Sequence, residues 1–308
     1  MTGRAPSSTG MRRLACLGAL VLWLVGCSTL AGNTVVIRET ADARLATRIK
    51  DGLFLTAGRI GPREAGPFVI DSGATHIVLD VELARELNPS LARESGPPAS
   101  QQRVRRGRLA SLEIGPVTFR NTDVVVTDLS FASGHLGERL AGFLGYPFFA
   151  RSVVEVNYST GTAACFDPKS YRLPRGEWRP LAFSANRPVV TARLEGDVEG
   201  QFVLDTGHTG TVLLYQDFAG KHALLDNRAS IKRTMRRVDG LYETRAVKLA
   251  WFEFAGQRFE QIVVEVAPAD IPRTGVERVA GIIGRGLLRR LTVVFDYSGS
   301  RIALLPNS

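Results

Sequence analysis

The stretch Phe68-Val69-Ile70-Asp71-Ser72-Gly73-Ala74-Thr75-His76-Ile77-Val78-Leu79-Asp80 runs three apolar residues into an acid, a hydroxyl residue and a glycine before a second apolar run begins. A carboxylate directly after a buried strand is costly unless it is neutralised, paired or used in chemistry. The glycine lets the chain turn tightly and expose backbone N–H groups near that carboxylate. Because Asp, Ser and Gly are also ordinary turn residues, this stretch alone favours a plain turn, and its meaning depends on the rest of the chain.

The same pattern returns in the second half of the chain, as Phe202-Val203-Leu204-Asp205-Thr206-Gly207. Three further segments return in the same order: the apolar stretches of 111–126 as 252–266, Ala141-Gly142-Phe143-Leu144-Gly145 as Ala280-Gly281-Ile282-Ile283-Gly284, and Val153–Tyr158 with Gly161 as Val293–Tyr297 with Gly299. Asp205 lies 134 residues after Asp71, and Tyr297 lies 139 residues after Tyr158. A nearly constant offset over four anchors indicates a tandem duplication of one β-rich unit.

Length and composition fit two globular units of this kind. The chain has 308 residues, 44% hydrophobic and 22% charged, and its 31 Gly and 15 Pro supply the turns that many short strands require. We expect an N-terminal lobe over residues 34–172 and a C-terminal lobe over 188–308. Residues 173–187 carry turn signals without strong periodicity and form the expected linker.

Three local expectations follow from the N-terminal unit. Asp80 is a suitable N-cap for a short helix through Leu87, which Asn88-Pro89 would end. Residues 95–108 form a polar, basic loop. Residues 111–119 and 122–126 predict a hairpin and a further strand.

The first residues are not expected to belong to the fold. Arg12 and Arg13 precede an apolar run that is too short to span a bilayer but fits a signal-peptide core. Its end, Leu24-Val25-Gly26-Cys27, resembles the lipobox of bacterial lipoproteins. That resemblance implies a signal peptide over residues 1–26 and a lipidated Cys27, with palmitate among its lipids, on a tether over 27–33. An ordinary secretory signal or an uncleaved anchor is the alternative.

The resemblance also implies a location. A lipidated Cys27 would hold the protein in the bacterial cell envelope, facing the periplasm. Ser28, rather than Asp, follows the cysteine and favours the outer membrane. Of the other cysteines, Cys16 lies in the removed segment, so Cys165 has no intramolecular partner and reads as a small buried residue.

The charge of the chain does not point to nucleic acid. The formal net charge of +9 becomes +6 once residues 1–26, with three arginines and no acids, are removed. Basic residues cluster at 103–108 and 232–237 without aromatic interleaving or a nucleic-acid motif. We therefore expect solvated loops or contacts with anionic surfaces rather than nucleic-acid binding.

Duplication supplies the partner that a single acidic turn lacks. If the units pack about a pseudo-twofold axis, Asp71 and Asp205 meet across it, and two carboxylates about 3 Å apart share one proton because they cannot both ionise. The charged carboxylate could then activate a water as general base while the protonated one acts as general acid on an amide carbonyl. The hydroxyls of Ser72 and Thr206 could bond backbone across the axis, and Gly73 and Gly207 could offer N–H groups to the carboxylates.

The paired hydrophobic-Asp-Ser/Thr-Gly motifs, each followed by an apolar-apolar-Gly segment, resemble the aspartic proteases of the retropepsin–pepsin group. The Gly-hydrophobic-hydrophobic-Gly and Asp/Asn-Tyr-x-x-Gly repeats look like two fused retropepsin-like units covering residues 34–308. The resemblance implies an all-β fold with two closed β-barrel lobes about a pseudo-twofold axis and an active cleft between them. It implies Asp71 and Asp205 as catalytic residues and Ser72, Gly73, Thr206 and Gly207 as their support. It also implies a protein or peptide substrate, and neither cofactor nor metal.

Two departures from the family pattern stand out. The residue after the glycine is usually small, as Ala74 is, but the second copy has His208, which could modulate the dyad or simply point outward. The flap that closes over substrate has two candidates, the loop 95–110 and the hairpin around 239–242, where Tyr242 would be a flap aromatic or an ordinary strand residue. His76 reads as a packed strand residue, and the four histidines lack metal-ligand spacing.

Two functions stay open at this point. The first is an active, membrane-tethered aspartic endopeptidase that works as a monomer, since each chain carries both motifs. The second is a catalytically inactive pseudo-protease lipoprotein that binds an extended peptide or an envelope partner between its lobes.

Overall fold

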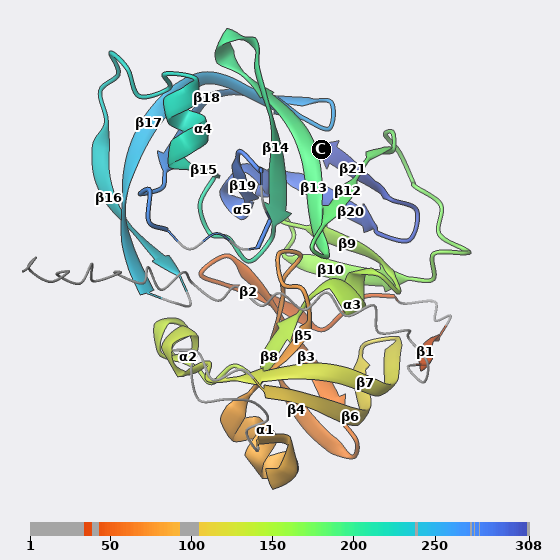
Figure 1. Cartoon of the computed structure of the whole chain (residues 1–308). Coiled ribbons are helices and arrows are strands. Elements are labelled where there is room, and N and C mark those ends of the chain that lie inside the picture. Colours follow the sequence, from red (N-terminus) through yellow and green to blue (C-terminus); the bar gives the residue numbers. More distant parts are fainter. Residues whose placement is uncertain are drawn as a thin grey trace, which may run out of the picture.

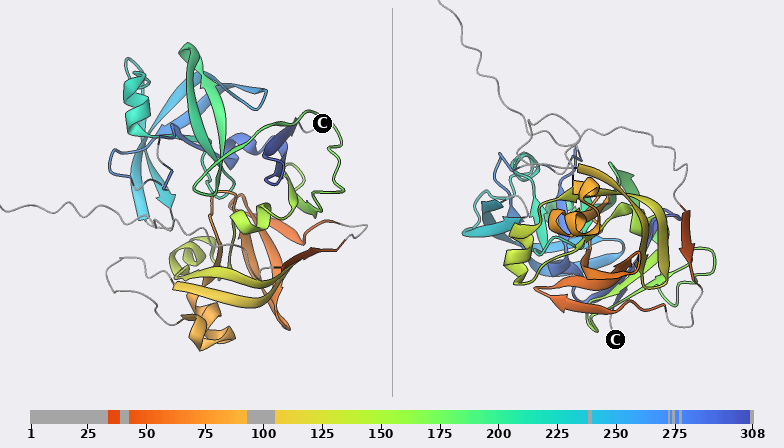
Figure 2. Two further views of the ribbon diagram at one scale, coloured as in Figure 1. Left: turned by 45° about the vertical axis from the view of Figure 1, so that its right-hand side comes forward. Right: turned by 90° about the horizontal axis from the view of Figure 1, so that it is seen from below.

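The structure is a computed structural model that describes residues 34–38, 43–92, 105–237, 240–271, 273, 275–276 and 278–306. Two β-rich lobes lie one above the other, with the N-terminal lobe at the bottom of Figure 1. The turned view on the left of Figure 2 shows the same division. Over the described ranges, no helix combines the length and apolar character needed to cross a membrane.

Six strands close the N-terminal barrel. They are β3 (Leu53–Ile60), β4 (Arg63–Ile70), β5 (Ile77–Asp80), β6 (Arg105–Ile114), β7 (Val117–Thr127) and β8 (Gly142–Leu144). They pair in the order β3-β4-β8-β5-β7-β6, and β6 pairs back to β3. Two short strands extend this sheet, β1 (Thr34–Ile37) on β7 and β2 (Thr47–Lys50) on β3.

The C-terminal barrel repeats this plan. Its strands are β13 (Arg187–Leu194), β14 (Val198–Asp205), β15 (Val212–Leu214), β17 (Gly240–Phe254), β18 (Gln257–Val266) and β19 (Gly281–Gly284). They pair in the order β13-β14-β19-β15-β18-β17, and β17 pairs back to β13. The outer strands are β12 (Ala182–Ser184) and β16 (Ile231–Arg237). The two closed barrels confirm the predicted fold class of two retropepsin-like lobes.

Alternation of side chains fixes which face of each strand is buried. In β18, Ile262 and Val264 point into the barrel, whereas Val263 is exposed. Successive side chains of a strand point to opposite faces, so alternate apolar residues fill the interior of the barrel while the residues between them face solvent.

The repeated Gly-apolar-apolar-Gly segments are explained by a close crossing. β8 runs between β4, with which it is parallel, and β5, with which it is antiparallel. A Cβ built on Gly142 would lie 1.8 Å from the carbonyl oxygen of Val78, and one on Gly281 would lie 1.9 Å from that of Leu213. No side chain fits at either position, so glycine is required in both copies.

Two expectations about the N-terminal lobe were wrong in detail. Residues 105–108, predicted as loop, belong to β6, because Arg105 continues the ladder opposite Val126 of β7. The predicted break between residues 119 and 122 is absent, because Asn121 adopts a positive φ of 52° and β7 continues through it. The β6–β7 pair is therefore one long hairpin.

Short helices close the ends of the barrels. They are α1 (Val81–Leu87), α2 (Ser130–Leu136), α3 (Tyr146–Phe149), α4 (Gln216–Lys221) and α5 (Arg285–Leu288), with 3₁₀ turns at Pro89–Ala92 and Glu195–Asp197. Asp80 caps α1, as predicted, by accepting hydrogen bonds from the N–H groups of Glu82 and Leu83.

A third sheet joins the two lobes and is called the interlobe sheet below. Its strands are β9 (Val153–Asn157), β10 (Thr162–Phe166), β11 (Arg179–Pro180), β20 (Leu291–Asp296) and β21 (Arg301–Pro306), in the order β10-β9-β20-β21-β11. The β9–β10 hairpin comes from the N-terminal half and the β20–β21 hairpin from the C-terminal half, and the two hairpins join where β9 pairs with β20. The expected linker, residues 173–187, thus contains β11 and β12 and begins β13.

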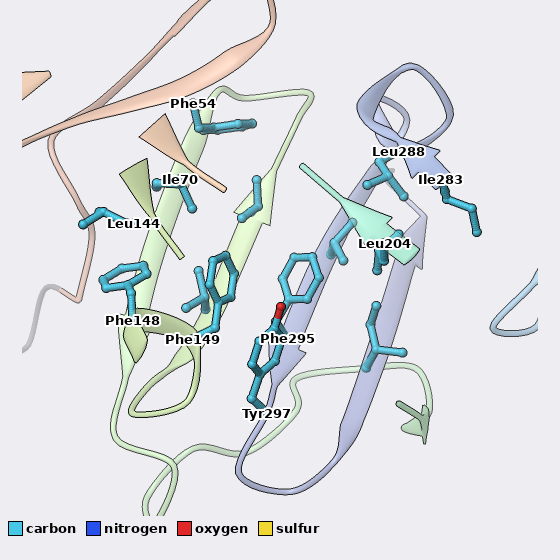
Figure 3. Packing of buried hydrophobic residues seen from close by; sticks show 14 of the residues in the cluster. Phe54, Ile70, Leu144, Phe148, Phe149, Leu204, Ile283, Leu288, Phe295 and Tyr297 are labelled. Carbon is cyan, nitrogen blue, oxygen red and sulfur yellow. The ribbon is translucent and has the colours of Figure 1, made fainter. Parts of the chain in front are cut away.

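The apolar core continues from one barrel to the other through this sheet. Figure 3 shows Phe148 and Phe149 of α3 beside Phe295, which lies in β20, and Tyr297, which directly follows that strand. The rings of Phe149 and Phe295 lie 5.3 Å apart, and those of Phe149 and Tyr297 lie 5.1 Å apart. The lobes are therefore joined by aromatic packing directly next to the ends of β4 and β14.

Candidate active site

Asp71 and Asp205 occupy equivalent places at the carboxyl ends of β4 and β14. Oδ1 of Asp71 accepts hydrogen bonds from the N–H groups of Gly73 at 2.9 Å and Ala74 at 3.1 Å. Oδ1 of Asp205 likewise accepts from the N–H groups of Gly207 at 2.8 Å and His208 at 3.0 Å. Each turn therefore holds its own carboxylate in a fixed orientation.

The two carboxylates meet between the lobes, and the glycines make room for them. A Cβ built on Gly73 would lie 2.4 Å from Cγ of Asp205, and one on Gly207 would lie 2.8 Å from Cγ of Asp71. Each glycine thus presents bare backbone to the carboxylate of the opposite lobe. Any larger residue would collide with that carboxylate.

Ser72 and Thr206 lock the two turns together through four cross-lobe hydrogen bonds. The N–H of Ser72 donates to Oγ1 of Thr206 at 2.9 Å, and the N–H of Thr206 donates to Oγ of Ser72 at 3.0 Å. Each hydroxyl also donates to a strand carbonyl across the axis, Ser72 to Leu204 and Thr206 to Ile70, both at 2.8 Å. Both side chains are buried, and the N–H and hydroxyl groups of each residue find their partner in the other lobe.

The environment favours the neutral form of Asp71. Burial raises the pKa of Asp71 well above its usual value, and the nearby charge of Asp205 raises it further. The N–H groups of Gly73 and Ala74 lower the pKa, but by less. A pair of this kind retains one proton above the pH at which an ordinary aspartate is ionised, and so offers a general acid and a general base side by side.

The raised pKa of Asp71 makes a prediction about stability. Because the folded protein holds this proton more tightly than the unfolded chain, the associated stability is complete below the ordinary value of 3.8 and is lost as the pH rises through the folded pKa. Asp71→Asn should therefore unfold at a higher temperature than wild type at pH 7 and lose that advantage towards pH 3. Each kcal/mol corresponds to about 2–4 °C in a chain of this size, and we expect a difference of that order.

Thermal unfolding of both proteins between pH 3 and pH 7.5 measures this trend. Asp123→Asn is the matched control, because Asp123 is exposed and pairs with Arg108 at the surface. A gain for Asp71→Asn that did not change with pH would contradict the assignment of a raised pKa to Asp71.

His208 does not distort the turn that contains it. Its N–H occupies the same role as that of Ala74, and its ring lies against Gly210 and Gly284 of its own lobe. A Cβ at Gly284 would come within 2.5 Å of Cδ2 of His208, so that glycine accommodates the ring. The imidazole thus finds its space in the C-terminal lobe.

Three other residues were singled out in the sequence. His76 lies in the bend before β5, with Thr75 Oγ1 2.8 Å from its Nδ1, and burial together with the charges of Arg106 and Arg187 lowers its pKa. Cys165 is buried in β10, as expected, and burial raises the pKa of its thiol. Cys27 and the segments 1–26 and 27–33 lie outside the described residues.

The two flap candidates differ in what the structure describes. Residues 95–104 lie outside the described part of the chain, and 105–110 belong to β6. In the C-terminal lobe, β16 and β17 form a hairpin in which Tyr242 lies opposite Met235. Tyr242 packs half-buried against an apolar cluster of its own lobe that includes Met235.

Sequence reasoning gave no role to two residues near the pair. Arg187 begins β13; burial lowers its pKa, while the charges of Asp205 and Asp71 oppose that shift, so its guanidinium lies in their field. Tyr297 follows β20, and its hydroxyl donates to the carbonyl oxygen of Ser72 at 3.3 Å. The repeated Asp/Asn-Tyr dipeptide after β9 and β20 was the available signal for Tyr297, whereas Arg187 has no counterpart in the first unit, where Leu53 begins β3.

The match to a protein family agrees with this duplicated architecture. A family model described as "Aspartyl protease" matches residues 57–148 and 190–287, one segment in each lobe, consistent with two fused retropepsin-like units. Among solved structures, Basic 7S globulin from soybean is similar over 90% of this chain and 95% of that chain, at 13% identity and a TM-score of 0.48. A comparison with curated protein sequences gives no match. Since the family model covers more than half of the sequence and both acidic turns, this chain belongs to the aspartyl protease family.

Proposed function

We propose that this protein is an aspartic endopeptidase that hydrolyses peptide bonds with a water activated by Asp71 and Asp205. The observation that carries the proposal is the cross-lobe lock of Ser72 and Thr206, which sets two half-buried carboxylates beside each other. A close pair of carboxylates in which one pKa is raised supplies both protonation states that amide hydrolysis needs. Protein or peptide is the substrate, and a single chain is sufficient because it supplies both aspartates.

The proposed reaction balances without a covalent intermediate. The ionised carboxylate takes a proton from water while the oxygen of that water bonds to the amide carbon. At the same time the protonated carboxyl gives its proton to the carbonyl oxygen. The resulting gem-diol then loses the amine as the C–N bond breaks, and the amine nitrogen takes the proton that the water had given up. The gem-diol hydroxyl returns a proton to the pair, which again holds one proton.

Cleavage of an unfolded protein by the purified full chain at mildly acidic pH tests this proposal. We expect new peptide ends and inhibition by a statine-type compound, which resembles the gem-diol and should bind more tightly than substrate. Absence of cleavage over a broad substrate panel, or cleavage indifferent to the inhibitor, would contradict it.

The second candidate is a pseudo-protease lipoprotein that binds an extended peptide or an envelope partner without cutting it. The observation that favours it is the bulky His208 in the place that Ala74 has in the first unit. His208→Ala separates the two readings. Cleavage that arises only in this variant would favour the pseudo-protease, whereas equal cleavage by both proteins would favour the peptidase.

We also propose that the protein is tethered to the bacterial cell envelope through lipid on Cys27, facing the periplasm, in the outer membrane. Leu24-Val25-Gly26-Cys27 and the following Ser28 support this proposal. Palmitate labelling should mark the wild-type protein and not Cys27→Ser, which should also leave the membrane fraction. A Cys27→Ser variant that stayed membrane-bound and labelled would refute the tether.

A further inference from the structure

One peptide unit in the Asp71 turn is held at both ends. The carbonyl oxygen of Ser72 accepts the hydrogen bond from Tyr297, and the N–H of Gly73, in the same peptide plane, donates to Oδ1 of Asp71 at 2.9 Å. The two bonds form a chain from the phenol through a rigid amide to the carboxylate. A donor on the carbonyl polarises the amide and makes its N–H a stronger donor.

The phenol ring of Tyr297 has little freedom to move. It is 5% exposed and packs on Phe149 at 5.1 Å and on Phe183 at 4.8 Å. Phe149 comes from the N-terminal lobe and Phe183 from β12, so rings on both sides of the lobe boundary fix its position. The hydroxyl is thereby aimed at the turn that contains Asp71.

The duplicated counterpart of Tyr297 lacks this bond. Tyr158 follows β9 as Tyr297 follows β20, and the ring of Phe54 meets it edge-on at 4.9 Å. Its hydroxyl is buried without a hydrogen-bond partner among the described residues. In the part of the chain that the structure describes, the chain of hydrogen bonds therefore exists on the Asp71 side of the pair and has no equivalent on the Asp205 side.

We propose that Tyr297 is a positioning residue that orients the Ser72–Gly73 peptide towards Asp71 and so makes the two aspartates inequivalent. This inference rests on the proposed function. The other charged or titratable side chains in the field of Asp71 are Asp205, Arg187 on β13 and Tyr158 on the interlobe sheet. Substitution of Tyr297 leaves all three in place.

Tyr297→Phe in the full chain tests the inference, because it removes the hydroxyl and keeps the ring. We expect the titration of Asp71, followed by NMR of isotopically labelled aspartate carboxyls, to move up by roughly half to one pH unit, since a weaker Gly73 N–H stabilises the charged form less. In the peptidase assay kcat should fall about threefold to tenfold with KM within about twofold, and the alkaline limb of the pH profile should shift in the same direction.

Tyr158→Phe is the matched control. It removes a hydroxyl that has no hydrogen-bond partner among the described residues, so the Asp71 titration and kcat should match wild type, and the unfolding temperature should be equal or higher. A fluorinated tyrosine at position 297, a stronger O–H donor, should move the Asp71 titration down instead of up. This opposite sign separates positioning from a general loss of packing.

The outcomes distinguish this inference from the proposed function. Equal titrations in Tyr297→Phe and Tyr158→Phe, or a change in unfolding temperature alone, would overturn the positioning role even in an active peptidase. Unequal titrations of the expected sign in a protein without peptidase activity would support the positioning role and refute the proposed function.

Discussion

Asp71→Asn and Asp205→Asn should each lower kcat by about 10²–10⁴-fold, with little change in KM. Either substitution replaces a group that exchanges protons with one that cannot, and the shared-proton mechanism needs both. The turn should survive, because the side-chain oxygen of asparagine can still accept the two backbone N–H bonds that hold each aspartate. The loss should therefore appear in the chemical step rather than in folding.

Asp80→Asn is a matched control from the same lobe. Asp80 likewise lies at the end of a strand and accepts backbone N–H groups, but it is buried and caps α1. Because asparagine is an equally good N-cap, kcat/KM should stay within about twofold of wild type. Single-turnover and steady-state cleavage of one peptide by the three variants measures the effect. Peptidase activity that survived in both Asp71→Asn and Asp205→Asn would refute the mechanism.

Gly73→Ala should abolish activity through geometry alone. The added methyl would lie 2.4 Å from Cγ of Asp205 and 2.6 and 2.7 Å from its two oxygens. Asp205 cannot swing away without losing the N–H bonds from Gly207 and His208. Displacement of a catalytic group by about 1 Å costs about 10²-fold in rate, and we expect kcat/KM to fall by at least that much. Gly207→Ala should act in the same way on Asp71, because its added methyl would lie 2.8 Å from Cγ of Asp71.

Gly134→Ala controls for the change of residue type. Gly134 lies within α2, and a Cβ there would meet nothing within 4 Å. The variant should keep full activity and gain up to about 1 kcal/mol of stability from the better helix former. Cleavage kinetics and thermal unfolding of the three alanine variants would check this. Full activity in Gly73→Ala would show that the carboxylates do not have to stay in their present places.

Much of the candidate site could be predicted because equivalent residues of two duplicated units are expected to lie close together at the axis that relates the units. The constant offset between Asp71 and Asp205, together with the idea of a pseudo-twofold axis, was enough to expect the hydroxyls of Ser72 and Thr206 to bond across it. In the structure each of these hydroxyls bonds to backbone of the other lobe. The paired glycines follow from the same symmetry, since each must admit the carboxylate of the other unit.

The remainder depends on contacts that periodicity does not encode. The bond from Tyr297 to Ser72 joins the interlobe sheet to a turn 225 residues earlier, and Tyr158, the same residue in the repeat, makes no such bond. The position of Arg187 in the field of both aspartates likewise depends on how β13 meets the opposite lobe. Within the expected linker, β11 depends on pairing with β21, more than a hundred residues later in the chain.

The register in which β9 pairs with β20 suggests an origin for the duplicated chain. Val153 faces Asp296 and Asn157 faces Thr292, and an offset of 139 residues makes Thr292 the counterpart of Val153 and Asp296 that of Asn157. The register is therefore the one that β9 would adopt with a second copy of itself, centred on Glu155. A half-length ancestor could have assembled as a symmetric homodimer on this strand, and fusion into one chain freed each half to change alone. The two halves now differ in the residue after the glycine, Ala74 or His208. They also differ in their tyrosines, since Tyr297 bonds to the opposite turn and Tyr158 does not. Two identical chains of a homodimer could not carry different residues at these positions.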